Sequence, residues 1–336
     1  MRIGARLRDV IPSYVDTLAD LPQFAADLES AGVDELVVGE HLLYSSDMPH
    51  AGGEQLGRAE RSSRSSDALV LFSAIAAATS RVSLCASALV AALHHPILLA
   101  RQSASLDQIS RGRFALGLTA GWFEAEFAAM SVPYEERFAR LEETILICRS
   151  LWQESPATFS GRWTNFVDMV CDPAPASAAG PAILVGARPS PTTVRRIVRL
   201  SDGWIASEAA TFDELERGIA AIHQECRSVG RDPAQLTFRV TLPDAGGDVS
   251  SLGRRAAPIV RIESSSEIDS LAANVAASID QLANVGVDHV ALPLSTYGLE
   301  RAAVRPFFDK LAALLGRGGH RSDGPGAEST IPAERF

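Results

Sequence analysis

Glu40 and His41 are the first residues of the chain whose types and position suggest chemistry. They come directly after the apolar run DELVVG at 34–39, where the chain leaves a predicted strand. An imidazole titrates near neutrality, so His41 can give or take a proton beside a reacting group. Glu40 can orient His41 or face the reacting group itself. The alternative is a histidine and a carboxylate that only pack at the rim of the fold.

Two loops of small residues are candidates for binding an anionic ligand. They are Ala120, Gly121 and Trp122 after the apolar run at 114–118, and Gly186, Ala187 and Arg188 after the run at 181–185. Small residues let backbone N–H groups approach an anion, and the second loop leads into a predicted helix N-terminus. The alternatives are an ordinary turn with a solvated Arg188, and a Trp122 that lines a pocket or packs under a neighbouring segment.

Other polar residues have weaker claims to a functional role. His94 and His95 follow another predicted strand and are further candidates for lining a pocket. Asp107 and Arg113 are predicted to form a structural ion pair. His289 lies within a predicted strand, where a structural role is favoured.

Eight apolar runs alternate with helical patterns between residues 2 and 315. The runs lie at 2–7, 34–39, 81–90, 114–118, 181–185, 202–207, 236–242 and 287–293. This alternation predicts an α/β fold, a (β/α)8 TIM barrel, whose active-site residues lie on the loops after the strands. A doubly wound open sheet is the alternative, but no run is followed by the GxGxxG pattern of dinucleotide-binding sheets.

The barrel is predicted to occupy residues 1–315 as one domain with three insertions. These are a lid insertion at 44–66, a β-hairpin insertion at 154–172 and an irregular segment at 244–263. The Gly-, Ser- and Pro-rich tail at 316–336 is predicted to be disordered.

Composition limits the functional classes. The chain has 336 residues, 46% of them hydrophobic and 21% charged, as expected of a soluble globular protein. A net charge of -10 argues against nucleic acid as a partner. No apolar run reaches the ~18 residues of a membrane helix. The four cysteines are scattered without a CxxC, so we expect reduced thiols, a cytoplasmic location and no metal site.

Four segments together resemble the bacterial luciferase-like monooxygenase superfamily, and most closely its branch of oxidoreductases that use the deazaflavin coenzyme F420. They are GVDELVVGEHL at 32–42, the segment at 81–122 with LDQISRGRFALGL and GW, the segment at 134–152 with ERF and LEE, and PAILVGARPSPTTVRRIVRLSDGW at 181–204. The resemblance implies a barrel with a flavin or deazaflavin at its C-terminal mouth. It also implies that His41 is the active-site histidine.

The same resemblance suggests how the cofactor is held. Ser87 and Ala88 match the place where many deazaflavin-dependent relatives carry a non-prolyl cis peptide, whose bulge supports the ring. Ala120, Gly121 and Trp122 match a phosphate-binding loop. The chain departs from the family at Ala187, where relatives usually have a second glycine, so strain would follow if Ala187 took a positive φ. It also has Ala120 where some relatives have a hydroxyl residue.

The predicted function is an oxidoreductase that transfers a hydride between coenzyme F420 and a small organic substrate. The alternatives are an FMN-dependent monooxygenase that uses O2, and a non-catalytic flavin- or deazaflavin-binding protein. Arginines on loops expected near the mouth could bind the polyanionic cofactor tail. They are Arg58, Arg61, Arg64, Arg188, Arg254 and Arg255. The expected partners are a small-molecule substrate and a second copy in a homodimer, with no nucleic acid and no membrane.

Overall fold

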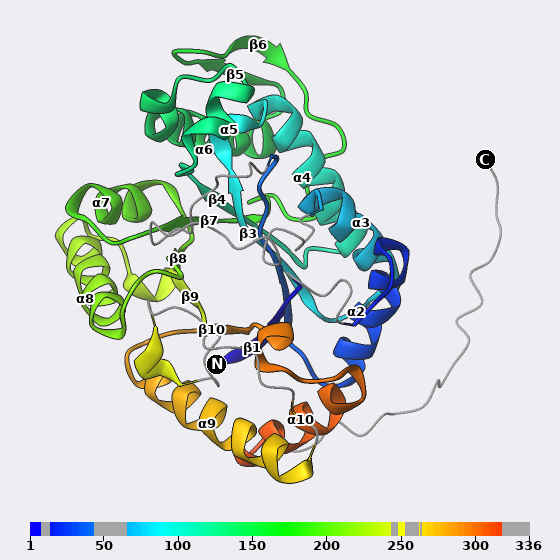
Figure 1. Ribbon diagram of the computed structural model, residues 1–336. Coiled ribbons are helices and arrows are strands. Elements are labelled where there is room, and N and C mark those ends of the chain that lie inside the picture. Colours follow the sequence, from blue (N-terminus) through cyan, green and yellow to red (C-terminus); the bar gives the residue numbers. More distant parts are fainter. Residues whose placement is uncertain (8–13, 44–65, 243–247, 253–261, 263, 318–336) are drawn as a thin grey trace.

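The computed structural model describes residues 1–7, 14–43, 66–242, 248–252, 262 and 264–317. Eight parallel strands form a closed barrel in the order β1-β10-β9-β8-β7-β4-β3-β2, and helices surround it (Figure 1). The predicted (β/α)8 barrel is therefore confirmed, and the open-sheet alternative is excluded.

The barrel strands are β1 (Arg2–Arg6), β2 (Glu35–Val38), β3 (Ser83–Val90), β4 (Phe114–Thr119), β7 (Ala182–Ala187), β8 (Gly203–Ala206), β9 (Thr237–Thr241) and β10 (His289–Leu292). The helices are α2 (Leu21–Ser30), α3 (Ala68–Ala78), α4 (Pro96–Ser110), α5 (Glu124–Ala129), α6 (Arg137–Gln153), α7 (Pro191–Leu200), α8 (Phe212–Ser228), α9 (Ser265–Asn284) and α10 (Arg301–Leu314). Short 3-10 helices lie at Leu18–Asp20, Ala91–Leu93, Tyr134–Glu136, Pro233–Gln235, Val249–Ser251 and Leu294–Tyr297.

Local sequence sets where the helices begin. A capping box of Thr211 and Glu214 opens α8, and one of Ser264 and Glu267 opens α9. In such a box each side chain accepts a backbone N–H that the first helical turn leaves unpaired. Pro191 starts α7, where a missing N–H costs nothing.

Alternate strand residues face the helices and the inside of the barrel. One residue from each of six strands forms a buried cluster separate from the main core: Val37, Cys85, Ala115, Leu184, Ile205 and Ala291. Their neighbours along the strands, such as Leu36 and Leu116, belong to the main core that the helices complete. Because successive side chains of a strand point to opposite faces, the separate cluster fills the barrel centre.

A buried charged cluster lies inside the barrel toward the N-terminal ends of the strands. Glu35 Oε1 lies 3.1 Å from Nη2 of Arg239 and 3.2 Å from Nδ1 of His289. Burial alone would raise the pKa of Glu35, but the charge and hydrogen bonds of Arg239 and the charge of His289 together lower it to about 2. His289 thus has the structural position that its sequence context favours.

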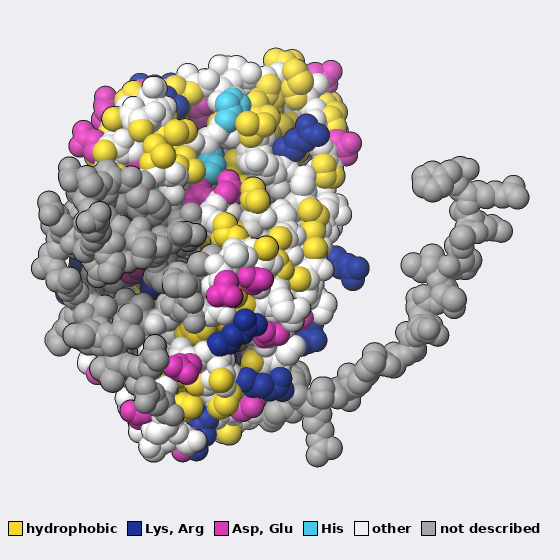
Figure 2. All heavy atoms as spheres, turned by 45° about the vertical axis from the view of Figure 1, so that its right-hand side comes forward, with side chains coloured by type: hydrophobic (Ala, Val, Ile, Leu, Met, Phe, Trp, Pro, Cys, Tyr) yellow, Lys and Arg dark blue, Asp and Glu magenta, His cyan; other side chains and the backbone are white. Residues whose placement is uncertain are grey.

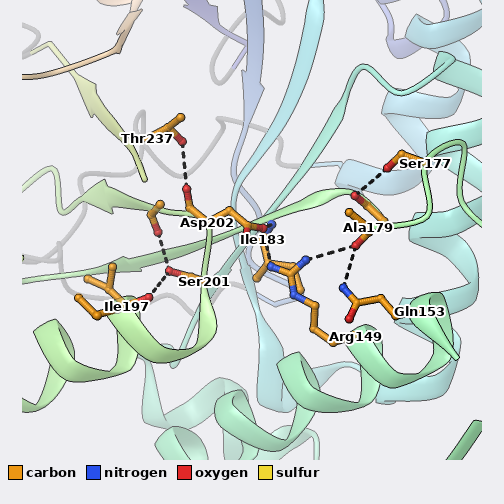
Figure 3. Close-up of polar contacts among 12 residues, drawn as sticks. Arg149, Gln153, Ser177, Ala179, Ile183, Ile197, Ser201, Asp202 and Thr237 are labelled. Atoms are coloured by element: carbon orange, nitrogen blue, oxygen red, sulfur yellow. Dashed lines mark hydrogen bonds and ion pairs between the residues drawn. The ribbon is translucent and has the colours of Figure 1, made fainter. Parts of the chain in front are cut away.

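Three aspartates, which we call the aspartate clasps, join neighbouring strands at this end. Each aspartate directly precedes a strand. Its backbone N–H donates to the carbonyl of a residue on the neighbouring strand, and its carboxylate accepts the backbone N–H of that same residue. The pairs are Asp34 with Ile3, Asp202 with Ile183, and Asp288 with Phe238. Figure 3 shows Asp202, whose carboxylate also contacts Arg149 Nη2 at 2.5 Å. The clasps fix strand register at the end of the barrel opposite the predicted site.

Arg113 precedes β4 at the position where the clasped strands have aspartate. Its guanidinium donates to four backbone carbonyls, among them those of Val82 and Ser110. The predicted ion pair of Arg113 with Asp107 is wrong, because Asp107 accepts the backbone N–H of Ala176 at 2.9 Å instead. Arg113 therefore provides hydrogen-bond donors to backbone carbonyls and forms no ion pair with Asp107.

A two-stranded antiparallel hairpin of β5 (Ala157–Ser160) and β6 (Asn165–Met169) lies between α6 and β7, within the predicted insertion at 154–172 (Figure 1). Most of the predicted lid at 44–66, irregular segment at 244–263 and tail at 316–336 lies outside the described residues. All four cysteines are free thiols. Among the described residues, no helix has the length and apolar character needed to cross a membrane.

Candidate active site

His41 lies just past the C-terminal end of β2 and is held by a carboxylate from the helix that follows β4. Its Nδ1 lies 3.1 Å from Oε2 of Glu126, a residue of the short helix α5. Oε1 of Glu126 accepts the backbone N–H of Leu42 at 2.5 Å and that of Leu43 at 3.2 Å. The Glu126 side chain is 1% exposed and the His41 side chain 19% exposed. The buried carboxylate fixes the imidazole and the two residues after it, while part of the ring stays accessible.

Glu40 forms a second carboxylate–imidazole pair. Its Oε1 lies 2.6 Å from Nε2 of His94, and its Oε2 accepts the backbone N–H of Ala68 at the start of α3. Glu40 therefore joins the end of β2 to the loop after β3 and to α3, and the carboxylate that contacts His41 belongs to Glu126. His95 is exposed at the start of α4. Figure 2 shows histidine and acidic side chains close together on one face of the molecule.

Strand β3 departs from regular pairing at the barrel mouth. Its register with β4 shifts between Ala86 and Leu89, which marks a bulge in the strand. The peptide bond between Ser87 and Ala88 is cis, so that prediction is confirmed.

Glycines of neighbouring strands make room for this bulge. A Cβ added to Gly39 would lie 2.5 Å from the Ser87 carbonyl oxygen, and one added to Gly117 would collide with the backbone of β3. A Cβ on Gly186 would lie 3.3 Å from the Cβ of Ala88. The three glycines come from β4, β7 and the end of β2, so this part of the barrel mouth is lined by backbone and small side chains.

The loop after β4 contributes an aromatic wall next to His41. The Trp122 ring meets the His41 ring edge-on, with centroids 5.5 Å apart. Gly121 has a φ of 84°, and a Cβ there would come within 2.8 Å of the Phe127 ring. Gly121 is therefore required by backbone conformation and packing, and Ala120 before it is buried. Anion binding by the backbone of this loop stays a prediction.

The loop after β7 tolerates its departure from the family pattern. Ala187 ends β7 without a positive φ, and its carbonyl accepts the indole N–H of Trp204 at 2.8 Å. Ala187 therefore does not have the backbone strain that a positive φ would cause. Arg188 contacts the Ala209 carbonyl and the Glu214 carboxylate, both at 3.2 Å, with its side chain 58% exposed. A phosphate role for Gly186, Ala187 and Arg188 stays a prediction.

This geometry can be compared with known proteins. The model of the luciferase-like monooxygenase family matches residues 2–257 of the chain. The chain belongs to this family. An uncharacterized protein of Mycobacterium tuberculosis is 30% identical over 216 residues, which cover 63% of this chain and 75% of that protein.

Relatives of this luciferase-like protein include users of both cofactors. The F420-dependent glucose-6-phosphate dehydrogenase of Kineococcus radiotolerans is 28% identical over 221 residues, 64% of this chain and 60% of that enzyme. The FMNH2-dependent dimethylsulfone monooxygenase of Pseudomonas putida is 32% identical over 167 residues, 49% of this chain and 45% of that enzyme. The chain therefore belongs with oxidoreductases and monooxygenases.

Solved structures share the fold of this luciferase-like chain. The monooxygenase RslO1 from Streptomyces bottropensis has a TM-score of 0.71 at 19% identity, covering 94% of this chain and 98% of that one. An F420-dependent secondary alcohol dehydrogenase in complex with an F420–acetone adduct has a TM-score of 0.68 at 17% identity, with the same coverage of both chains. At these identities the likeness extends to the barrel fold alone.

Two features of the luciferase-like site were not found from the sequence. One is Glu126, a carboxylate in the first turn of a helix that begins just after the small-residue loop, which is a weak signal by itself. The other is the ion pair between Arg6, at the end of β1, and Glu208, after β8, with Nη1 and Oε1 2.7 Å apart. The available signal for Arg6 was a charged residue at the C-terminal end of a predicted strand.

Some predicted ligand groups cannot be placed. Arg58, Arg61, Arg64, Arg254 and Arg255 lie outside the described residues. Within the described part of the chain, no cluster of three or more His, Cys, Asp and Glu residues is suited to a metal ion.

Proposed function

We propose that this protein is an oxidoreductase that transfers a hydride between coenzyme F420 and a small organic substrate, with His41 moving the accompanying proton. The observation that carries the proposal is the position of His41. It stands at the C-terminal mouth of the barrel, held by Glu126 and faced by Trp122, one strand away from the bulge in β3. Active sites of (β/α)8 barrels lie at this end.

The residues at the mouth suit a flat cofactor ring. Gly39, Ala88 and Gly186 present backbone or a single methyl group around the bulge. When bound, coenzyme F420 supplies a ring carbon that accepts or donates hydride. The chain's own residues must hold the ring, place the substrate beside it and limit access of water.

His41 handles the proton that must move when a hydride is transferred. Hydride transfer removes two electrons and one hydrogen from an alcohol-type substrate, so the hydroxyl hydrogen must leave as a proton. His41 accepts this proton and releases it to water, or supplies it when the reaction runs in the reductive direction. Trp122 packs edge-on against the imidazole and narrows the space from which a substrate can approach.

The FMN alternative rests on a specific observation. The dimethylsulfone monooxygenase relative, which depends on FMNH2, is 32% identical over 167 residues. The bulge in β3 supports the F420 proposal, because it lies where the resemblance places the ring support of many deazaflavin-dependent relatives. A non-catalytic cofactor-binding protein would show binding without turnover.

Titration distinguishes these functions. Purified protein is titrated with coenzyme F420 and with FMN at one salt concentration, followed by fluorescence or calorimetry, and then assayed for coenzyme oxidation or reduction with a panel of small alcohols, aldehydes and ketones. We expect tighter binding of F420 and turnover without oxygen consumption. Tighter binding of FMN with oxygen consumed would establish the monooxygenase instead, and F420 binding without turnover on any substrate would favour the non-catalytic protein.

A further inference from the structure

We propose that Glu126 is the positioning residue that selects the tautomer of His41, so that proton exchange with a substrate passes through Nε2. This inference rests on the proposed function for its catalytic meaning, but the tautomer itself is a property of the free protein. Glu126 lies 85 residues along the chain from His41 and reaches it from the loop after β4.

The bonding of the two carboxylate oxygens carries the argument. Oε1 accepts the N–H groups of Leu42 and Leu43, which are always donors. Oε2 is the oxygen that faces Nδ1 of His41, at 3.1 Å. An ionised carboxylate only accepts hydrogen bonds, so Nδ1 must carry the hydrogen of the neutral imidazole. The remaining lone pair is then on Nε2, which becomes the proton-accepting atom.

The surroundings of Glu126 make this arrangement rigid. Its side chain is 1% exposed, and Phe127 beside it is fully buried. The Phe127 ring packs edge-on against Tyr134, with centroids 5.2 Å apart, and Gly121 leaves the space that this ring needs. The carboxylate is thus fixed before any substrate binds, as effective positioning of a catalytic imidazole requires.

The same contact serves His41 before and after proton transfer. When Nε2 takes a proton, Nδ1 still donates to the Glu126 carboxylate, as it does in the neutral ring. Glu126 therefore holds the imidazole in one orientation throughout the transfer.

Glu126→Gln gives a sharp test, because glutamine keeps the size of the side chain. Its amide oxygen can accept from Leu42 and Leu43, which turns the NH2 group toward His41. An NH2 group donates, so Nδ1 becomes the acceptor and the hydrogen moves to Nε2. Long-range 1H–15N correlation spectra of the free protein distinguish the two tautomers, with His41→Gln used to assign the signals. We expect the Nδ1–H form in the unaltered protein and the Nε2–H form in Glu126→Gln.

Kinetics supply the second readout. We expect kcat of Glu126→Gln to fall about 10²- to 10⁴-fold, the usual contribution of a positioned acid or base, with KM and coenzyme affinity little changed. Glu124→Gln is the matched control, since Glu124 is an exposed residue of the same helix and should leave both spectra and kcat unchanged. Glu40→Gln should leave the His41 tautomer unchanged, because Glu40 bonds to His94.

The outcomes separate the two proposals. An Nε2–H tautomer of His41 in the unaltered protein would overturn the role of Glu126 whatever the cofactor, and this result does not require a folded Glu126→Gln variant. An unchanged tautomer in a folded Glu126→Gln variant would overturn it as well. Failure of F420 to bind would overturn the proposed function and leave the tautomer result standing.

Discussion

Gly39→Ala is expected to damage the cofactor site through the backbone of β3. The added Cβ would lie 2.5 Å from the Ser87 carbonyl oxygen, closer than the 3.0 Å below which real Cβ atoms are essentially never found. Neither atom belongs to a flexible side chain, so the bulge must withdraw by about half an ångström or more. Forced rearrangements of this kind cost about 1–3 kcal/mol. We expect a loss of that size in the free energy of unfolding, and a roughly 10-fold or greater weakening of coenzyme binding if the bulge supports the ring.

Gly186→Ala is the matched comparison, because it adds the same methyl group on the other side of the bulge. Its Cβ would lie 3.3 Å from the Cβ of Ala88, a contact that a small movement relieves. We expect a change below about 1 kcal/mol in unfolding free energy. Urea unfolding and coenzyme titration of both variants provide the measurements. Equal effects in the two variants, or full coenzyme affinity in a destabilised Gly39→Ala, would refute the idea that the bulge forms the floor of the site.

Three further outcomes are expected. His41→Ala should keep its fold and coenzyme affinity but lose about 10²- to 10⁴-fold in kcat, and unchanged turnover would remove His41 from the mechanism. Asp202→Ala should lower the free energy of unfolding in urea by about 2–4 kcal/mol, because the buried N–H of Ile183 loses its acceptor. Asp202→Asn should lower it less, because its amide oxygen can still accept, and equal losses in the two variants would contradict this. The pKa of Glu35 is lowered from 4.5 to about 2, so its ionisation stabilises the fold above pH 4.5, and this contribution, about 3 kcal/mol, is lost as pH falls from 4.5 toward 2. The difference in unfolding free energy between the protein and Glu35→Gln should therefore become smaller as the pH falls from 6 to 3. A difference that stays constant would show that the ionisation of Glu35 does not contribute to the loss of stability in acid.

The fold could be predicted from the sequence because each strand is encoded locally. Runs such as FALGL at 114–118 are apolar throughout, as strands buried on both faces must be, and each is followed by a helical pattern. The order of these elements then leaves few topologies, and the barrel is one of them. Predicted strand ends lie within a few residues of the observed ones, as for the predicted strand at 287–293 and β10 at His289–Leu292.

The site was only partly predictable, because its key contacts join distant segments. His41 was found since it follows a recognisable strand, but no local pattern shows that Glu126 would reach it across 85 positions. Glu40 sits next to His41 in sequence, yet successive side chains leaving a strand point in opposite directions, and it bonds to His94. Adjacency in the sequence therefore did not predict which side chains contact each other. The wrong ion pair of Asp107 and Arg113 has the same cause, since both groups satisfy backbone atoms that sequence does not reveal.

The aspartate clasps have a consequence for how such a barrel can change over evolution. Each clasp ties a strand to its immediate neighbour by two hydrogen bonds, and all three sit at the end of the barrel away from the mouth. Each of these aspartates also accepts, with its backbone carbonyl, the N–H of the first residue of the next strand around the barrel: Ser83 for Asp34, Thr237 for Asp202 and Arg2 for Asp288. Each clasp thus holds three consecutive strands in alignment at the end away from the mouth. The loops at the mouth can therefore be rebuilt without touching the contacts that align the strands, which leaves substrate choice free to change on an unchanged frame.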